Sequence, residues 1–318
     1  MASVCVYGGE ALGRYGFPDG HPFGLWRMQA FWGELVRSQL HRQICVQPPV
    51  MATQAEIERF HEHTYVERVK AQSVNGTGYL DYGDTPAFPG VYEAAATVVG
   101  TGLDALHRIL SGECRRAFVP IGGLHHARRE GAAGFCVFND CGVVIETLLA
   151  EHHMTRIAYV DIDAHHGDGV YYGFVGDSRV YIADMHEDGR YLYPGTGAAH
   201  ETGRGAAAGT KLNIPVAPGA DHSAFMKLWP TIEDFIRQAK PEFILLQCGA
   251  DSLAGDPLTH LRLCADSHYH ATRQLCLLAE EYCQGRILAM GGGGYDAANI
   301  ASAWTAVVRA MLETPAGP

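Results

Sequence analysis

The segment IAYVDIDAHHGDG occupies residues 157–169 and decides the fold class of this chain. Its first part, Ile157–Val160, is too apolar for a surface strand and predicts a strand buried in a sheet. Asp161, Asp163 and His165 alternate along the segment, so a continuing strand places their side chains on one face. Three ionisable groups on a buried strand carry a large desolvation cost unless they bind a cation or one another. The segment therefore predicts a buried strand that ends in a functional site.

Similar short apolar runs recur along the chain and alternate with helical patterns. The predicted strands are Ser3–Tyr7, Arg116–Pro120, Ile157–Ile162, Val180–Met185, Phe243–Cys248 and Ile287–Met290. The predicted helices lie near Leu25–Leu40, Gly90–Ser111, Cys141–His152, Ser223–Ala239, Asp266–Cys283 and Ala297–Leu312. This alternation is typical of a central parallel sheet flanked by helices on both faces. No repeat or low-complexity linker interrupts it, so we expect one α/β domain over residues 1–318.

The composition excludes several classes of protein. A hydrophobic content of 47% and a charged content of 19% are ordinary for a soluble enzyme. The formal net charge of −11 argues against a nucleic-acid binder and is compatible with a cationic substrate. Nine cysteines without a CxxC pair indicate a reducing compartment, and neither a signal peptide nor a bilayer-spanning run is present. We expect a cytoplasmic protein that contacts neither nucleic acid nor membrane.

Two long connections break the regular alternation. Ile121–Asn139 is rich in Gly, His and Arg, and Tyr193–Lys211 is rich in Gly. Loops of this length in a compact domain are usually functional. In open α/β sheets the site lies beyond the carboxyl ends of the strands, and each polar cluster of this chain follows such an end. We therefore expect these polar clusters to lie together in one site.

Asp163 and His165 form an Asp-x-His pair, and Asp251 follows another apolar run, FILLQCGA. Catalytic zinc sites keep three protein ligands and leave one position open for water or substrate. These three residues predict such a site. Two carboxylates and one imidazole also suit other divalent metals. Asp161 is left for a neighbouring histidine or a second cation.

His125 and His126 lie in the first long connection. Adjacent histidines beside a metal site indicate general acid–base groups, because imidazole titrates near neutrality. Each needs a carboxylate to fix its tautomer, and Asp161 and Asp168 are available. The other pair, His152–His153, is better interpreted as the exposed C-terminal face of a helix.

Gly291–Gly294 follow the last apolar run and precede Tyr295. Four glycines permit close approach of the backbone to a ligand. A phosphate-binding loop is the alternative, but the G-x-G-x-x-G and GK[ST] patterns are missing. Tyr295 can donate a hydrogen bond to a developing oxyanion.

These motifs together resemble those of the histone deacetylase superfamily, within the broader arginase-like fold. The motifs are GGLHHA (122–127), GFCVFND (134–140), YVDIDAHHGDGV (159–170), YPGTG (193–197), GADSLAGDPL (249–258) and GGGGY (291–295). HPFGLWR (21–27), FHEHTYVERV (60–69) and GDTPAFPG (83–90) also look like family segments. The compact chain and DPLTHLRL (256–263) look most like bacterial acetoin-utilisation-type deacetylases and related histone-deacetylase-like amidohydrolases.

The resemblance implies a zinc-dependent hydrolysis of N-acetyl-lysine or a similar acyl-lysine. The implied catalytic roles are zinc ligation by Asp163, His165 and Asp251, acid–base catalysis by His126 with Asp168 and by His125 with Asp161, and carbonyl polarisation by Tyr295. The implied substrate contacts are Phe135 and Tyr193 as tunnel walls, Gly134 at the floor, Gly293 and Leu258 along the path, and Asp84 at the rim. A K⁺ site is implied at Asp161, Asp163, His165, Asp184 and Met185. Asp184 departs from the hydroxyl residue common there, and Tyr193 from a frequent phenylalanine.

The sequence also bears on three alternative functions. A two-metal ureohydrolase of the arginase class needs carboxylates where this chain has Gly167 and Gly249. A catalytically inactive reader is disfavoured because His126, Tyr295 and the metal ligands are all present. A small-molecule substrate such as an acetylpolyamine is the remaining alternative. The physiological substrate, the acyl length, the native metal and the oligomeric state stay open at the level of sequence.

Overall fold

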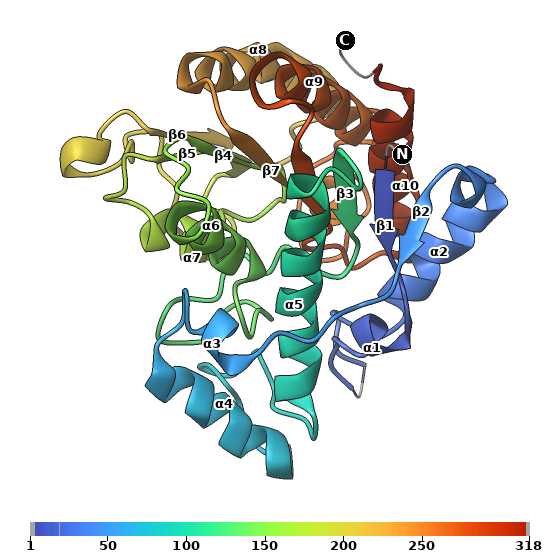
Figure 1. Cartoon of the computed structure of the whole chain (residues 1–318), viewed down its shortest axis with the longest axis vertical. Helices are drawn as coiled ribbons and strands as arrows, with labels where there is room; N and C mark the ends of the chain where they lie inside the picture. Colours follow the sequence, from blue (N-terminus) through green and yellow to red (C-terminus); the bar gives the residue numbers. More distant parts are fainter. Residues whose placement is uncertain (1–3, 19, 316–318) are drawn as a thin grey trace.

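The computed structural model describes residues 4–18 and 20–315, which contain one sheet of eight parallel strands with helices on both faces (Figure 1). The spatial order of the strands is β2-β1-β3-β8-β7-β4-β5-β6. Their bounds are β1 Val4–Tyr7, β2 Cys45–Gln47, β3 Arg116–Val119, β4 Ile157–Asp161, β5 Val180–Glu187, β6 Lys211–Val216, β7 Phe243–Gln247 and β8 Ile287–Met290. Because neighbouring strands all pair in parallel, their carboxyl ends share one edge of the sheet.

The helices form two layers around the sheet. Helices α2, α8, α9 and α10 pack together on one face, α5, α6 and α7 cover the other, and α1, α3 and α4 pack on α5 (Figure 1). Their bounds are α1 Glu10–Gly13, α2 Arg27–Arg37, α3 Gln54–Ile57, α4 His63–Asn75, α5 Val91–Leu110, α6 Asp140–Ala150, α7 Asp168–Gly173, α8 His222–Ala239, α9 Ala265–Cys283 and α10 Ala297–Glu313. Short 3₁₀ turns are η1 Leu40–Arg42, η2 Gly205–Ala207 and η3 Ala250–Ser252.

The predicted architecture, a single α/β domain with a parallel sheet between helical layers, is confirmed. Every predicted strand and helix is present, with ends that differ by no more than three residues. The central strands β3, β4, β7 and β8 are buried along their whole length, which is why their sequences are apolar on both faces. The predicted domain limits, residues 1 and 318, and the predicted strand residue Ser3 lie outside the described residues.

The sequence patterns miss two edge strands, the surface helix α4 and the short helices α1, α3 and α7. β2 and β6 lie at opposite ends of the sheet and are only partly buried, and β6 contains Pro215, a residue tolerated at a sheet edge. Helix α4 packs mainly on α5 and buries only Tyr65, Val66, Val69 and Ser73, a narrow stripe. A partly buried element has a weak hydrophobic pattern, and the sequence alone does not reveal such an element.

The strand-alternation argument for Asp161, Asp163 and His165 is wrong in one respect. β4 ends at Asp161, so Asp163 and His165 lie in the following loop. The Ile162 N–H donates to the Gln247 carbonyl at 3.0 Å, and the neighbouring strand β7 ends at Gln247. Pairing with β7 stops here for that reason. In the described part of the chain, no helix combines the length and the apolarity that a membrane crossing requires.

Candidate active site

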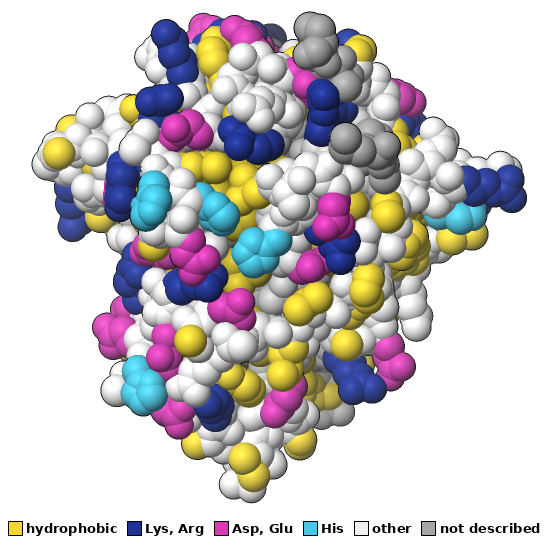
Figure 2. Space-filling model, viewed as in Figure 1, with side chains coloured by type: hydrophobic (Ala, Val, Ile, Leu, Met, Phe, Trp, Pro, Cys, Tyr) yellow, Lys and Arg dark blue, Asp and Glu magenta, His cyan; other side chains and the backbone are white. Residues whose placement is uncertain are grey.

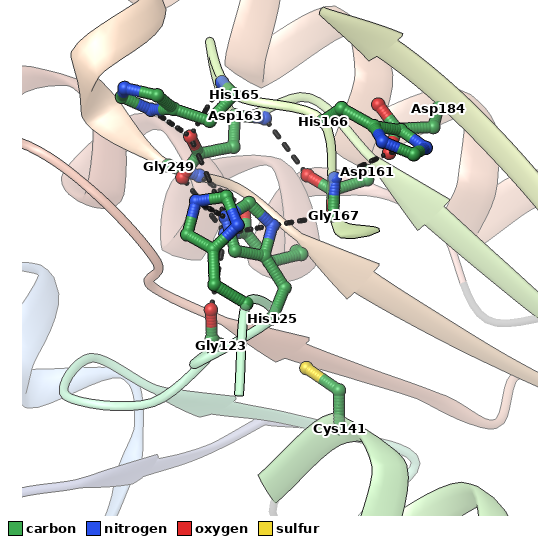
Figure 3. A network of polar contacts seen from close by, with 12 residues as sticks. Gly123, His125, Cys141, Asp161, Asp163, His165, His166, Gly167, Asp184 and Gly249 are labelled. Carbon is green, nitrogen blue, oxygen red and sulfur yellow. Dashed lines mark hydrogen bonds and ion pairs between the residues drawn. The ribbon is translucent and has the colours of Figure 1, made fainter. Parts of the chain in front are cut away.

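Four loops meet at the carboxyl edge of the sheet. They follow β3, β8, β7 and β4, which are consecutive in the spatial order of the strands. The close-up in Figure 3 shows residues from three of these loops close together, among them His125, Asp163 and Gly249. The topology thus brings together polar groups that are more than a hundred residues apart in the sequence, such as His125 and Asp251.

Asp163, His165 and Asp251 form a buried group whose potential ligand atoms all lie within 4.8 Å of one another. The Nδ1 atom of His165 lies 3.0 Å from Oδ1 of Asp163 and 3.1 Å from Oδ2 of Asp251. Burial and the charge of Asp163 raise the pKa of Asp251 to about 7. A divalent cation between the two carboxylates offsets their repulsion, so this donor set fits a three-ligand zinc site with an open position.

Glycines and one glutamine position these carboxylates. A Cβ atom at Gly249 would overlap the Asp163 carboxylate, and one at Gly293 would overlap Asp251. The Gly293 N–H donates to Oδ2 of Asp163 at 2.8 Å, and Nε2 of Gln247 donates to the same oxygen at 2.9 Å. Asp163 is therefore fixed by groups outside the donor set, as expected where ligand orientation matters.

His125 and His126 lie side by side, with their Nε2 atoms 3.1 Å apart. Nδ1 of His125 donates to Asp161 at 2.8 Å, and Nδ1 of His126 donates to Asp168 at 2.7 Å. These are the two pairs that the sequence predicts, and all four side chains are buried. With both Nδ1 atoms engaged, the Nε2 atoms are left for chemistry.

The two imidazoles have opposite electrostatic environments. Burial lowers the pKa of His125, but the charges of Asp161 and Asp163 outweigh it and raise this pKa to about 10. Burial and the charge of His125 lower the pKa of His126 to about 4. Neighbouring titratable groups with separated pKa values are typical of acid–base pairs. At neutral pH, His126 is the imidazole that can accept a proton.

Tyr295 is held at the end of the glycine run. Its backbone N–H donates to Oδ2 of Asp256 at 2.9 Å, and the buried Arg27 donates to the carbonyls of Gly292 and Gly294. Burial keeps the pKa of the phenol well above its usual range, so the phenol stays protonated. Within the described residues its hydroxyl makes no hydrogen bond and is free to donate one to a carbonyl oxygen.

Aromatic rings flank the approach to this centre. The Phe135 ring centroid lies 5.8 Å from that of Tyr295, and the Tyr193 centroid lies 5.1 Å from that of His126. Gly134 has a φ of 53°, and a Cβ there would overlap the His126 ring. A small cavity beyond them is lined by Gly134, Gly293, Tyr295, His126, Asp163 and His165. Gly134 therefore shares a cavity with the donors Asp163 and His165, and the rings of Phe135 and Tyr193 pack against two other lining residues, Tyr295 and His126.

A wider cavity of about 390 Å³ opens beside Tyr193. It is lined by Asp81, Tyr82, Gly83, Asp84, Arg128, Ala132, Ala133 and Tyr193. Asp84 is exposed there, as expected for a rim residue. Leu258 is 38% exposed, and its N–H donates at 2.9 Å to Asp256, the residue that also binds Tyr295. We call this cavity together with Leu258 the rim.

The predicted K⁺ ligands lie on and after β4 and β5. Asp161 and Asp184 are paired positions in these strands. Oδ1 of Asp184 accepts from His186 at 2.7 Å, and its Oδ2 accepts the Gly167 N–H at 2.9 Å (Figure 3). Asp184 therefore already has a buried imidazole as a partner, and its charge raises the pKa of His186 against the effect of burial. The K⁺ site, including Asp163, His165 and Met185, stays a prediction.

Several positioning residues were not singled out from the sequence. Gln247 ends the apolar run FILLQ, so a polar residue closing a buried strand was a usable signal. Asp140 accepts the N–H groups of Gly123 and Leu124 at 2.8 and 2.7 Å and so fixes the loop that carries the histidines. Arg27 gives no local signal, because its partners lie more than 260 residues away.

The structure also explains the glycines that count against a two-metal centre. A Cβ at Gly167 would lie 2.7 Å from an oxygen of Asp161. At Gly249, even a Cβ would overlap Asp163. Neither position has room for the extra carboxylate that a ureohydrolase requires. The packing around the donor set therefore supports a single divalent ion.

Comparison with known proteins agrees with this geometry. Residues 21–311 match the histone deacetylase domain. The chain is 36% identical to the acetoin utilization protein AcuC of Bacillus subtilis, over 92% of this chain and 78% of that protein. It is 33% identical to histone deacetylase clr6 of Schizosaccharomyces pombe, over 95% of this chain and 75% of that protein. The crystal structure of the HDA15 HD domain matches with a TM-score of 0.88 and 25% identity, over 99% of this chain and 90% of that one. The chain therefore belongs to the histone deacetylase family of amide hydrolases.

Proposed function

We propose that this protein is a zinc-dependent deacetylase that hydrolyses the amide of N-acetyl-lysine, or of a similar acyl-lysine, in proteins or peptides. One observation carries the proposal. The buried donors Asp163, His165 and Asp251 lie beside two carboxylate-bound imidazoles and the free phenol of Tyr295. Amide hydrolysis requires an activated water, a proton carrier and an oxyanion donor, and this group supplies all three.

The catalytic residues divide the work as follows. Asp163, His165 and Asp251 would hold a divalent ion, which would supply a lowered pKa for the attacking water and polarisation of the amide carbonyl. Neutral His126 accepts the proton of the attacking water through Nε2, while Asp168 holds Nδ1. Tyr295 donates a hydrogen bond to the carbonyl oxygen as charge develops there. A protonated imidazole then donates to the leaving amine, and the products are acetate and a free amine.

The rim favours a peptide over a small amine. Asp84 can accept hydrogen bonds from main-chain amides that flank an acyl-lysine, a contact that a polyamine does not offer. Leu258 presents an apolar side chain where an anion would be needed to attract a distal ammonium group. The alternative, an acetylpolyamine or other small-molecule amidohydrolase, is favoured by the two carboxylates, Asp81 and Asp84, in the rim cavity. All nine cysteines are free thiols, which supports a reducing compartment such as the cytoplasm.

The direct test measures acetate release by the purified protein from acyl-lysine peptides of several chain lengths and from acetylpolyamines. We expect peptide deacetylation that a chelator abolishes and zinc restores. After dialysis against metal-free buffer, one divalent metal should remain per chain. Activity on no acylated amine, in a protein that retains its metal, would contradict the proposal.

A further inference from the structure

A second group of potential metal ligands lies on the surface and shares no residue with the catalytic loops. The ligand atoms of His107, Glu151 and His152 all lie within 4.8 Å of one another, and the three residues are exposed. Figure 2 shows histidine side chains gathered on the face of the molecule where α5 and α6 lie in Figure 1. The proposed deacetylase chemistry uses none of these residues.

The ends of two packed helices set the geometry of this cluster. His107 lies in the last turn of α5, and Glu151 and His152 follow the end of α6. The turn after α6 is closed by hydrogen bonds from Glu151 N–H to Thr147 at 2.9 Å and from Met154 N–H to Leu148 at 3.1 Å. The imidazole centroids of His107 and His152 are 6.5 Å apart. The backbone hydrogen bonds of this turn, and the packing of α5 against α6, hold the three ligands in place.

Both imidazoles are available as ligands. In the part of the chain that the structure describes, no hydrogen bond reaches a ring nitrogen of His107 or His152. Burial and the charge of His107 lower the pKa of His152, which favours the neutral form that binds metals. The negative end of a helix dipole attracts a protonated histidine, which accounts for a single histidine at the end of α5 or of α6. It does not account for two imidazoles that lie beside the same carboxylate.

The third donor is oriented by a neighbouring cation. Oε1 of Glu151 accepts from Arg59 at 2.6 Å, and Arg59 also donates to Thr147 at 3.0 Å. This leaves Oε2 of Glu151 for a further partner. The Arg59 charge opposes a metal ion, but the carboxylate of Glu56 lies close enough to interact with both Arg59 and His107. When both imidazoles are neutral, the carboxylates of Glu56 and Glu151 and the guanidinium of Arg59 sum to a net negative charge.

We propose that His107, Glu151 and His152 form a second, surface binding site for a divalent transition metal of the zinc type. Two imidazoles and one carboxylate are a donor set that zinc uses in proteins, with water completing the coordination. Because the cluster is exposed and Arg59 is close, this site binds metal more weakly than the buried centre and exchanges it on dialysis. A bound ion ties the end of α5 to the end of α6.

The test uses untagged protein that has been dialysed and retains its catalytic metal. Equilibrium dialysis against added Zn²⁺, followed by elemental analysis, should find one further equivalent per chain. The double variant His107→Gln/His152→Gln should lose this equivalent, and His107→Gln alone should weaken it about tenfold or more. His153→Gln removes an adjacent exposed histidine and is the matched control, which should bind like the wild type. Zn²⁺ should raise the melting temperature of the wild type but not of the double variant.

A crystal soaked in Zn²⁺ should give an anomalous peak between the three side chains. An extra equivalent that persists unchanged in the double variant, or no extra equivalent in the wild type, overturns the proposal. None of these readouts depends on deacetylase activity, so failure of this proposal leaves the proposed function untouched.

Discussion

The buried centre and the exposed rim of this enzyme are built on different principles. In the centre, the carboxylates of Asp161, Asp163 and Asp251 are almost completely buried, and each accepts hydrogen bonds from defined partners. At the rim, Tyr82 and Leu258 are exposed and lie on loops. The centre has one arrangement because unpaired buried charge is costly, whereas the rim can vary without destabilising the fold. Under the proposed function, we therefore expect the centre to carry the chemistry and the rim to set substrate choice.

Arg128 connects the two regions. Its guanidinium is half exposed and lines the rim cavity, yet Nη2 donates at 3.2 Å to Asp168, the carboxylate that orients His126. Substitutions in the centre should abolish or strongly reduce turnover for every substrate. Substitutions at the rim should change the relative rates of different substrates. The expected loss of activity therefore decreases from the metal ligands outward to the rim.

Asp251→Asn should have the largest effect, because it removes one of two anionic ligands from the donor set. We expect loss of the tightly bound metal by elemental analysis and of detectable acetate release. Asp266→Asn, an exposed aspartate in the first turn of α9, is the control and should behave like the wild type. A variant that keeps its metal and its activity would show that the donor set is wrongly identified. Two tightly retained metals in the wild type would instead favour the ureohydrolase alternative.

His126→Ala should lower kcat by roughly two to four orders of magnitude, the range for loss of a general base. His125→Ala should be no more damaging, because His125 is the imidazole held in its charged form by Asp161 and Asp163. Steady-state kinetics with one acetyl-lysine peptide compare the two variants. A larger loss in His125→Ala would reverse the two roles.

Tyr295→Phe should lower kcat roughly a hundredfold and leave the metal content intact, as expected for loss of one oxyanion donor. The fold should be unaffected, because the Tyr295 hydroxyl has no hydrogen-bond partner among the described residues. The same reduction should appear with peptides and with small acetylated amines. Turnover equal to that of the wild type would mean that another group stabilises the oxyanion.

Leu258→Glu moves the test to the rim. An anion beside the mouth should attract the distal ammonium of an acetylpolyamine and shift the ratio of kcat/KM values toward it by one to two orders of magnitude. Each tenfold step corresponds to roughly 1.4 kcal/mol. Leu258→Gln, of similar shape but uncharged, is the control. If the wild type already prefers acetylpolyamines over peptides, Leu258 does not determine specificity and the peptide substrate is wrong.

The same contrast explains what the sequence could predict. The central strands are buried on both faces, so their apolar runs identify them, and a carboxylate or histidine that ends such a run is conspicuous, as with Asp163 and Asp251. Partly buried elements such as β6 and α4 lack that contrast. Contacts such as those from Arg27 to the glycine loop and from Arg128 to Asp168 depend on tertiary packing and leave no local pattern. The sequence therefore predicted which candidate groups lie together, but not several of the residues that hold them, and the reactivity of these groups stays a prediction.

Asp84 should give the smallest effect and the one most sensitive to pH. Burial and a hydrogen bond with Asp81 raise the pKa of the Asp84 carboxyl to about 7. Because its pKa is raised, the Asp84 carboxyl becomes protonated at a higher pH than an ordinary aspartate does. Asp84 therefore accepts amide hydrogen bonds as a full carboxylate only above neutral pH. The advantage of a peptide over a small acetyl-lysine analogue without flanking amides should therefore decline between pH 8 and pH 6.

Asp84→Ala should remove about tenfold of that advantage at pH 8, the scale of lost hydrogen bonds to a charged acceptor, and should make it independent of pH. Asp84→Asn keeps an acceptor without a charge and should retain part of the advantage at every pH. The measurement is the ratio of kcat/KM values for the two substrates, in which any effect of pH on the catalytic centre cancels. A ratio that changes with pH in Asp84→Ala as it does in the wild type would place the titrating group elsewhere on the rim.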